Sequence, residues 1–350
     1  MLGSRSVVIV GGARTPFALA GTAHKQLLAV DLARAAVKGV LARAGLPPSL
    51  PQAVVLGAVV QEPKTSNVAR EAALAAGLPA STFASTVTAA CISANVAAQS
   101  ITDQILAGRI DCGIAGGVEL MSDVPIRFSR AVRARMLASQ KARGVGGYLA
   151  LLAGLKLADL APELPGITEY STGETMGLSS EKLASRWGVS RADADAFALR
   201  SHQLALKAHL DGRLAPDILT MPHVVVPAGA GGAKAPALGP GSATWDNPVK
   251  ADSTLAKLQS LKPAFDKSSP LATHTAGNSS PLTDGASALL LMEQSRAAAE
   301  GLPALARIVD SEWVARDPKS ELLLGPAYAI ARLLHRRGLS ASEVDVLEIH

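Results

Sequence analysis

Aromatic side chains are scarce in this chain of 350 residues, where Phe, Trp and Tyr together make up 3%. Proteins that bind single-stranded nucleic acid stack the bases on aromatic rings, so the scarcity argues against a nucleic-acid partner. Charged residues are also few, at 18%, and the net charge is +5. A positive balance of this size fits an anionic small ligand or an acidic surface equally well.

Long apolar runs and cysteines are scarce as well. No run reaches the roughly 18 residues that a membrane-spanning helix needs, and no secretory signal precedes the first expected strand, at residues 6–10. The two cysteines, Cys91 and Cys112, are therefore expected to be reduced. A G-x-G-x-x-G motif is absent: Gly11 and Gly12 are followed by Pro16, which blocks a helix there, so no dinucleotide site is predicted.

The hydrophobic periodicity predicts an α/β protein, because short apolar strands alternate with amphipathic helices. A helix–Gly–strand unit recurs: the helix over residues 27–44, Gly45 and a strand near residue 54 are echoed by the helix over 327–337, Gly338 and an expected strand over 344–349. This weak repeat indicates two pseudo-symmetric halves. Further strands are expected at residues 83–88, 110–115 and 289–292, and further helices at 179–187 and 191–210.

Cys91 lies where the expected strand over 83–88 gives way to a helix rich in small residues. Free backbone N–H groups at a helix N-terminus favour a thiolate and can hold a developing oxyanion, so we interpret Cys91 as a nucleophile for acyl transfer. The alternative is that Cys91 is a small buried side chain, which is the usual role of an isolated intracellular cysteine. Cys112 lies within an apolar strand and is expected to be inert.

Three segments carry a family resemblance: residues 87–95 around Cys91, the Arg-Thr-Pro-Phe run at 14–17, and residues 273–288 with Asn-Ser-Ser and Asp-Gly-Ala. Together they resemble the thiolases, above all the β-subunits of trifunctional fatty-acid β-oxidation complexes. The resemblance implies a layered α-β-α-β-α fold of two halves. It also implies three domains: residues 1–120 with 251–295, an inserted cap over 121–250, and a partial second half over 300–350.

The resemblance implies the cleavage of 3-oxoacyl-CoA by coenzyme A, with no prosthetic group and no metal. Cys91 is the implied nucleophile, and His350 matches the first residue of a His-Glu-Ala-Phe motif that holds an oxyanion-stabilising group. The residues implied to contact coenzyme A are Met176, Lys250, Ala276 and Ser280. Lys250 stands where the family often has arginine, and a lysine lacks the planar fork for bidentate binding. Phe128 similarly replaces a common histidine.

The family's Gly-His-Pro motif and second catalytic cysteine would follow His350, so the chain is expected to lack the C-terminal part of the family. A non-catalytic acyl-CoA-binding or truncated subunit is therefore an alternative function. A biosynthetic acetoacetyl-CoA thiolase is another, and a 3-oxoacyl synthase of the same fold is a third.

Residues 127–157 combine a basic stretch with an apolar one. This pattern is typical of a segment that lies on a membrane surface, although a solvated face beside an ordinary core helix fits it too. The resemblance favours peripheral membrane association. It also implies a homodimer that pairs with a hydratase/dehydrogenase α-subunit, in the bacterial cytoplasm or, for a eukaryotic source, in mitochondria.

Overall fold

The computed structural model describes residues 5–221 and 245–350, which form two compact units. The larger unit contains the residues up to 123 together with those from 168 onward, and the smaller one contains residues 124–167. The predicted cap boundaries, 121 and 250, stay a prediction. Residues 222–244, which belong to the predicted cap, lie outside the described residues.

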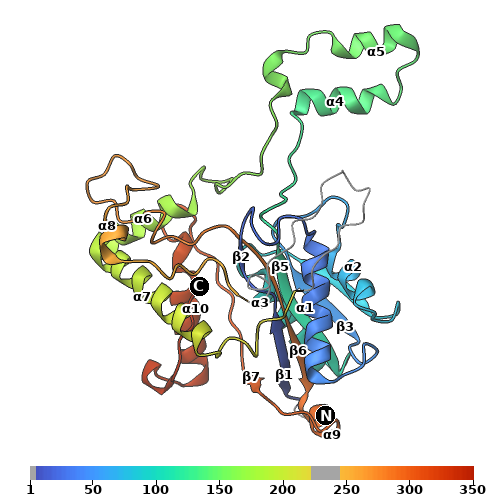
Figure 1. The fold of residues 1–350 in the computed structure, drawn as a ribbon. Helices are drawn as coiled ribbons and strands as arrows, with labels where there is room; N and C mark the ends of the chain where they lie inside the picture. Colours follow the sequence, from blue (N-terminus) through green and yellow to red (C-terminus); the bar gives the residue numbers. More distant parts are fainter. Residues whose placement is uncertain (1–4, 222–244) are drawn as a thin grey trace. The chain divides into compact units, whose positions relative to one another are not determined.

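A mixed β-sheet organises the larger unit (Figure 1). Its order in the described part of the chain is β4-β3-β5-β6-β1-β7, and β2 pairs with β6. β3, β4 and β5 run parallel, whereas β6 runs antiparallel to both β5 and β1. The strands are β1 (Val7–Arg14), β2 (Ala18–Leu19), β3 (Ala53–Gly57), β4 (Phe83–Val87), β5 (Cys112–Glu119), β6 (Thr283–Glu293) and β7 (Ala306–Ile308).

Helices cover both faces of this sheet, which explains why β3 is apolar and buried throughout. Alternate residues of β3 point to opposite sides: Val54 and Leu56 pack with α1 (Ala29–Ala44) and α2 (Val68–Ala75), while Val55 packs against α3 (Ser93–Leu106). The remaining helices of this unit are α6 (Met176–Trp187), α7 (Arg191–Leu210), α8 (Leu255–Gln259), α9 (Gln294–Ala299) and α10 (Gly325–Arg337), with 3₁₀ turns η2 (Leu322–Leu324) and η3 (Ala341–Glu343).

The repeated unit forms only in part. α1 and α10 both end at a glycine in the left-handed conformation, Gly45 and Gly338, each with φ 66°. The strand expected over residues 344–349 is absent, and this prediction is wrong. These residues are mostly exposed and no strand of the described chain pairs with them, so their β-forming composition has no ladder to join.

The smaller unit is a pair of short helices, α4 (Arg130–Ser139) and α5 (Gly144–Leu152), followed by the 3₁₀ turn η1 (Leu157–Leu160). Ser129 caps α4 by accepting a hydrogen bond from the Val132 N–H at 3.3 Å. Arg133 pairs with Glu163 at 3.0 Å, and residues 127 and 163 form an antiparallel bridge. α4 has no buried residue.

Candidate active site

Cys91 is exposed and lies on the turn that connects β4 to α3, as the sequence predicts. The turn is tight: Ala90 has φ 49°, the one left-handed non-glycine residue of the described chain. The Ser93 hydroxyl accepts a hydrogen bond from the Ala89 N–H at 2.8 Å and donates one to the Ala90 carbonyl at 2.6 Å. A locally strained backbone that is held by such contacts is common at functional sites.

Small residues bring α3 close to the sheet directly behind this turn. A Cβ added to Gly57, the last residue of β3, would collide with the Ser93 carbonyl carbon and come within 2.6 Å of the Ala94 nitrogen. One added to Gly117 of β5 would come within 2.9 Å of the Ala94 Cβ. The N-terminus of α3 therefore lies over the carboxyl ends of the parallel strands, the edge at which open α/β sheets bind ligands.

Cys112 lies on β5 and differs from Cys91 in every relevant property. It is 2% exposed within the apolar core between the sheet and α1. Burial raises the pKa of its thiol to about 12, so it stays protonated at neutral pH. Of the two thiols, only that of Cys91 is exposed to solvent.

A cavity of about 360 Å³ lies between the middle of α7, α8 and the loop that precedes β6. We name it the α7–α8 cavity, and its size falls within the range of small-molecule sites, about 300–1,000 Å³. Its polar lining includes cations and hydroxyls that suit an anionic ligand. The lining residues used below are His202, Lys250, Lys257, Ala276, Gly277 and Ser279.

The two lysines that line this cavity differ in whether a carboxylate pairs with them. Lys257 pairs with Asp252 at 2.7 Å, whereas no carboxylate of the described residues pairs with Lys250. The Lys250 N–H donates to His202 Nδ1 at 3.4 Å. Burial, and secondarily the charge of Lys250, lower the pKa of His202, so this imidazole is neutral at pH 7.

The structure brings two of the predicted coenzyme A residues to this cavity and leaves two outside it. Lys250 and Ala276 line it. Ser280 is exposed, and its neighbour Ser279 lines the cavity instead, with a buried hydroxyl that finds no hydrogen-bond partner among the described residues. Met176 is the first residue of α6, 36% exposed, and is not part of this lining.

The other predicted positions have no partner in this site. His350 is exposed and lies beyond η3, outside any helix or strand. Phe128, in the smaller unit, is 54% exposed. No hydrogen bond to the Cys91 thiol is present in the described structure, and no His, Cys, Asp or Glu side chains there converge as a metal site requires.

Arg14 holds together the segments that lead into the cavity. Its guanidinium binds both oxygens of Asp246, at 2.7 and 2.8 Å, and lies 4.7 Å from the centre of the Phe17 ring. Asp246 also accepts the Phe17 N–H at 2.8 Å and faces His209 Nε2 at 3.1 Å. The start of the 245–250 segment, which carries Lys250, is thereby tied to the end of β1 and to α7.

The fold and the site together define an α/β protein with an exposed cysteine at the carboxyl edge of its sheet. Comparison with family models identifies the family. The thiolase N-terminal domain matches residues 7–295, and the thiolase C-terminal domain matches residues 302–350. The chain belongs to the thiolase family and is an acyltransferase.

Individual relatives agree with this assignment. The mitochondrial trifunctional enzyme subunit beta of Homo sapiens is 48% identical over 346 residues, which cover 99% of this chain and 69% of that protein. A 3-ketoacyl-CoA thiolase of Yersinia pestis is 40% identical over 98% of this chain and 76% of its own. The crystal structure of the Bacillus anthracis acetyl-CoA acetyltransferase matches with a TM-score of 0.82 and 31% identity, covering 99% of this chain and 80% of that one.

Proposed function

We propose that this protein is a 3-oxoacyl-CoA thiolase of fatty-acid β-oxidation, with Cys91 as its nucleophile. The observation that carries the proposal is the exposed Cys91 thiol on the strained turn between β4 and α3. The names of the relatives give the substrate class, since they include a 3-ketoacyl-CoA thiolase and a trifunctional enzyme subunit.

The reaction forms and breaks one thioester on the protein. The Cys91 thiolate attacks the 3-keto carbon, the bond between C2 and C3 breaks, and the acetyl-CoA enolate leaves and takes up a proton. The acyl group stays on Cys91 until the thiolate of a second coenzyme A attacks it. That step releases an acyl-CoA two carbons shorter and regenerates the Cys91 thiolate. The dipole of α3 favours the anions in both steps, because the N–H groups of Ala94 and Asn95 in its first turn have no backbone acceptor in the described structure.

Coenzyme A is a substrate in this proposal, and the α7–α8 cavity receives part of it. Lys250 and Ala276, both implied by the family resemblance, lie in its lining. The cationic Lys250 suits a phosphate group, and the unpartnered Ser279 hydroxyl offers a hydrogen bond. Met176 and Ser280 stay proposed contacts of coenzyme A, and His350 a proposed oxyanion-region residue, although none of the three lines this cavity.

The same proposal extends to partners and location. The likeness to the trifunctional enzyme subunit beta supports a further subunit as partner, for which we propose the hydratase/dehydrogenase α-subunit, and the homodimer is proposed from the family resemblance alone. The compartment is then the mitochondrion for a eukaryotic source and the cytoplasm for a bacterial one. Among the described residues, every helix is too short or too polar to cross a bilayer.

Mass spectrometry of the protein after brief exposure to 3-oxohexadecanoyl-CoA tests the proposal. We expect an acyl adduct on Cys91, its loss on addition of coenzyme A, and no adduct in Cys91→Ser. Labelling of Cys91 by iodoacetamide in the same sample shows that the thiol is accessible. An accessible thiol that forms no adduct, in a protein that still binds coenzyme A, would contradict catalysis and favour a non-catalytic acyl-CoA-binding subunit.

A further inference from the structure

Two charged residues one turn apart on α7, Arg191 and Asp195, form a pair that the proposed chemistry does not use. Asp195 is completely buried, and its Oδ2 accepts a hydrogen bond from Arg191 Nε at 2.8 Å. A buried carboxylate costs several kcal/mol unless its oxygens are all satisfied. The contacts of its second oxygen and of the rest of the guanidinium therefore show what the pair holds in place.

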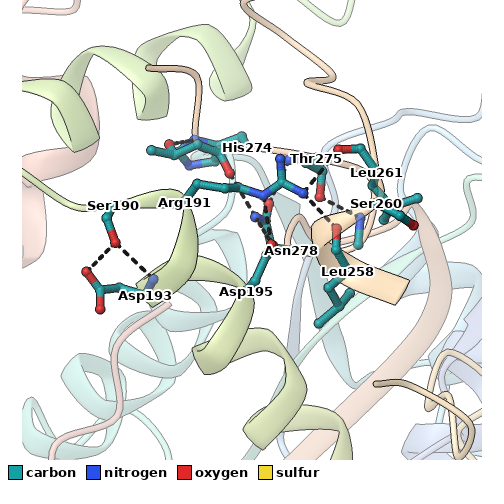
Figure 2. Close-up of polar contacts among 12 residues, drawn as sticks. Ser190, Arg191, Asp193, Asp195, Leu258, Ser260, Leu261, His274, Thr275 and Asn278 are labelled. Atoms are coloured by element: carbon teal, nitrogen blue, oxygen red, sulfur yellow. Dashed lines mark hydrogen bonds and ion pairs between the residues drawn. The ribbon is translucent and has the colours of Figure 1, made fainter. Parts of the chain in front are cut away.

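The second oxygen of Asp195 holds the loop that precedes β6. Asn278 Nδ2 donates to Asp195 Oδ1 at 2.9 Å and to the Thr273 carbonyl at 2.8 Å, and Asn278 Oδ1 accepts the Thr275 N–H at 2.7 Å (Figure 2). Asn278 thus closes the 273–278 loop on itself and fastens it to α7. The cavity-lining residues Ala276, Gly277 and Ser279 lie in or directly beside this loop.

The guanidinium of Arg191 holds the opposite wall. Its Nη2 donates to the Leu258 carbonyl at 2.6 Å and to the Leu261 carbonyl at 3.1 Å, at the C-terminal end of α8 (Figure 2). Leu258 and Leu261 both line the α7–α8 cavity. One ion pair therefore reaches both walls, one through each of its members.

The two walls touch at Gly277. A Cβ added there would lie 2.5 Å from Leu261 Cδ1 and 2.6 Å from Leu258 Cδ2, so the backbone of the loop packs directly on the side chains that follow α8. A small displacement of either wall therefore changes the shape of the cavity. Glu181 of α6 also binds the loop, through the N–H groups of Thr273 and His274 at 2.9 Å, but ahead of the lining residues.

We infer that Arg191 and Asp195 are positioning residues that hold the two walls of the coenzyme A cavity at binding distance. Neither side chain lines the cavity, so both act through Asn278 and through the carbonyls of Leu258 and Leu261. The inference rests on the proposed function, because it takes coenzyme A as the occupant. It assigns to α7 the control of affinity for this substrate, separate from the chemistry at Cys91.

Calorimetric titration of coenzyme A into the 350-residue protein tests this inference, with thermal unfolding measured beside it. In Asp195→Asn one carboxylate oxygen becomes an NH₂ group, which cannot accept a hydrogen bond. Either Asn278 or Arg191 then loses its acceptor, and the wall that this residue holds is released. Because the loss of a hydrogen bond to a charged group typically changes an equilibrium constant by about 10-fold to 100-fold, we expect Kd to rise by up to that factor. Arg191→Lys is a second variant that keeps the charge, but its single ammonium cannot reach Asp195 and both carbonyls.

Glu293→Gln is the matched control, since it also alters a buried carboxylate. Glu293 is 8% exposed at the last residue of β6 and accepts the Arg296 N–H at 3.0 Å, whereas the cavity loop precedes the first residue of β6. Its loss should lower the unfolding temperature and leave Kd for coenzyme A within about twofold. The double variant Asp195→Asn, Asn278→Asp exchanges the two side chains, so that residue 195 donates the hydrogen bond and residue 278 accepts it. We expect this variant to recover at least part of the lost affinity for coenzyme A.

The possible outcomes separate the inference from the proposed function. Weaker binding in Asp195→Asn and Arg191→Lys with an unchanged Kd in Glu293→Gln supports the inference. If both α7 variants bind coenzyme A with the Kd of the wild type, the inference is wrong, because the ion pair then only stabilises the fold. The proposed function is unaffected by that result. If the wild-type protein binds no coenzyme A, then coenzyme A is not the ligand of the cavity, and both that assignment and the inference are wrong.

Discussion

At the scale of single residues, the Arg14–Asp246 pair is the clearest electrostatic feature near the cavity. Burial alone would raise the pKa of Asp246, but the hydrogen bonds from Arg14 and from the Phe17 N–H outweigh it and hold this pKa below its ordinary value. A lowered carboxyl pKa stabilises the fold at any pH above the unfolded value, about 4, and the contribution is lost as pH falls through the folded value.

Asp246→Asn should therefore lower the free energy of unfolding by about 3 kcal/mol at pH 7, since it leaves Arg14 without its partner. The difference from wild type should shrink as pH falls below about 4, because the carboxylate then takes up its proton in the unfolded chain before it does so in the folded one. Urea unfolding at pH 7 and at lower pH measures both quantities. A difference that stays constant down to pH 3 would show that the ion pair is not its source.

The two thiols provide a second prediction at this scale. Iodoacetamide at pH 8 should label one site per folded chain, Cys91, because the Cys112 thiol is buried and has a pKa of about 12. In urea both cysteines should react. Peptide mapping counts the labelled sites, and Cys91→Ser is the control. Labelling of Cys112 at a comparable rate in the folded protein would disprove the assignment of inert and reactive thiols.

At the scale of elements, the position of Cys91 depends on the close approach of α3 to β3. Gly57→Ala would force the Ser93 and Ala94 backbone away from the sheet. We expect a loss of about 1–3 kcal/mol in unfolding free energy, as for other overpacked sites, and slower acylation of Cys91. Gly166→Ala is the control, because a Cβ at Gly166 meets nothing within 4 Å. Equal acylation rates in the two variants would show that this approach does not position the nucleophile.

The sequence predicts elements well where local signals mark both ends. α7 spans Arg191–Leu210 as expected, because Ser190 caps its start and the turn at residues 211–212 follows its end. The expected strand over 344–349 is wrong, because a strand also needs a pairing partner, which local composition does not reveal.

In the candidate site, too, the parts that form one stretch of sequence are predictable, and the contacts between distant segments are not. The nucleophile turn and the loop beside Ala276 are visible as motifs in one stretch of sequence. His202 and Lys257 were missed, because they come from α7 and α8 and meet the loop only through tertiary packing. The pairing of Asp195 with Asn278 joins residues 83 positions apart, and nothing in the local pattern of α7 indicates it.

At the scale of the whole molecule, the match to the N-terminal thiolase model spans residues 7–295, a range that includes the smaller unit. The smaller unit, residues 124–167, exposes many apolar side chains beside its arginines. Those at least half exposed include Ile126, Phe128, Met136, Leu137, Val145, Leu149, Leu157, Leu160, Leu164 and Ile167. A basic and apolar surface of this kind suits the headgroup layer of an anionic membrane.

We therefore predict that the protein sediments with vesicles of phosphatidylglycerol and phosphatidylcholine, and that binding weakens as salt screens the lipid charge. Replacing the exposed residues Arg130, Lys141 and Arg143 by Gln should weaken binding by about 100-fold, since each basic residue near the surface contributes about 1 kcal/mol.

A variant with the same loss of charge in the larger unit, at the exposed residues Lys38, Lys64 and Lys267, is the control and should bind nearly as well as wild type. If both variants lose binding equally, net charge alone accounts for the attraction and the 124–167 unit has no special role. If neither loses it, the contact does not depend on these charges, and the apolar side chains become the ones to substitute. The prediction holds only if the loss follows the unit in which the charges lie, because only then does the protein bind the bilayer through one defined surface.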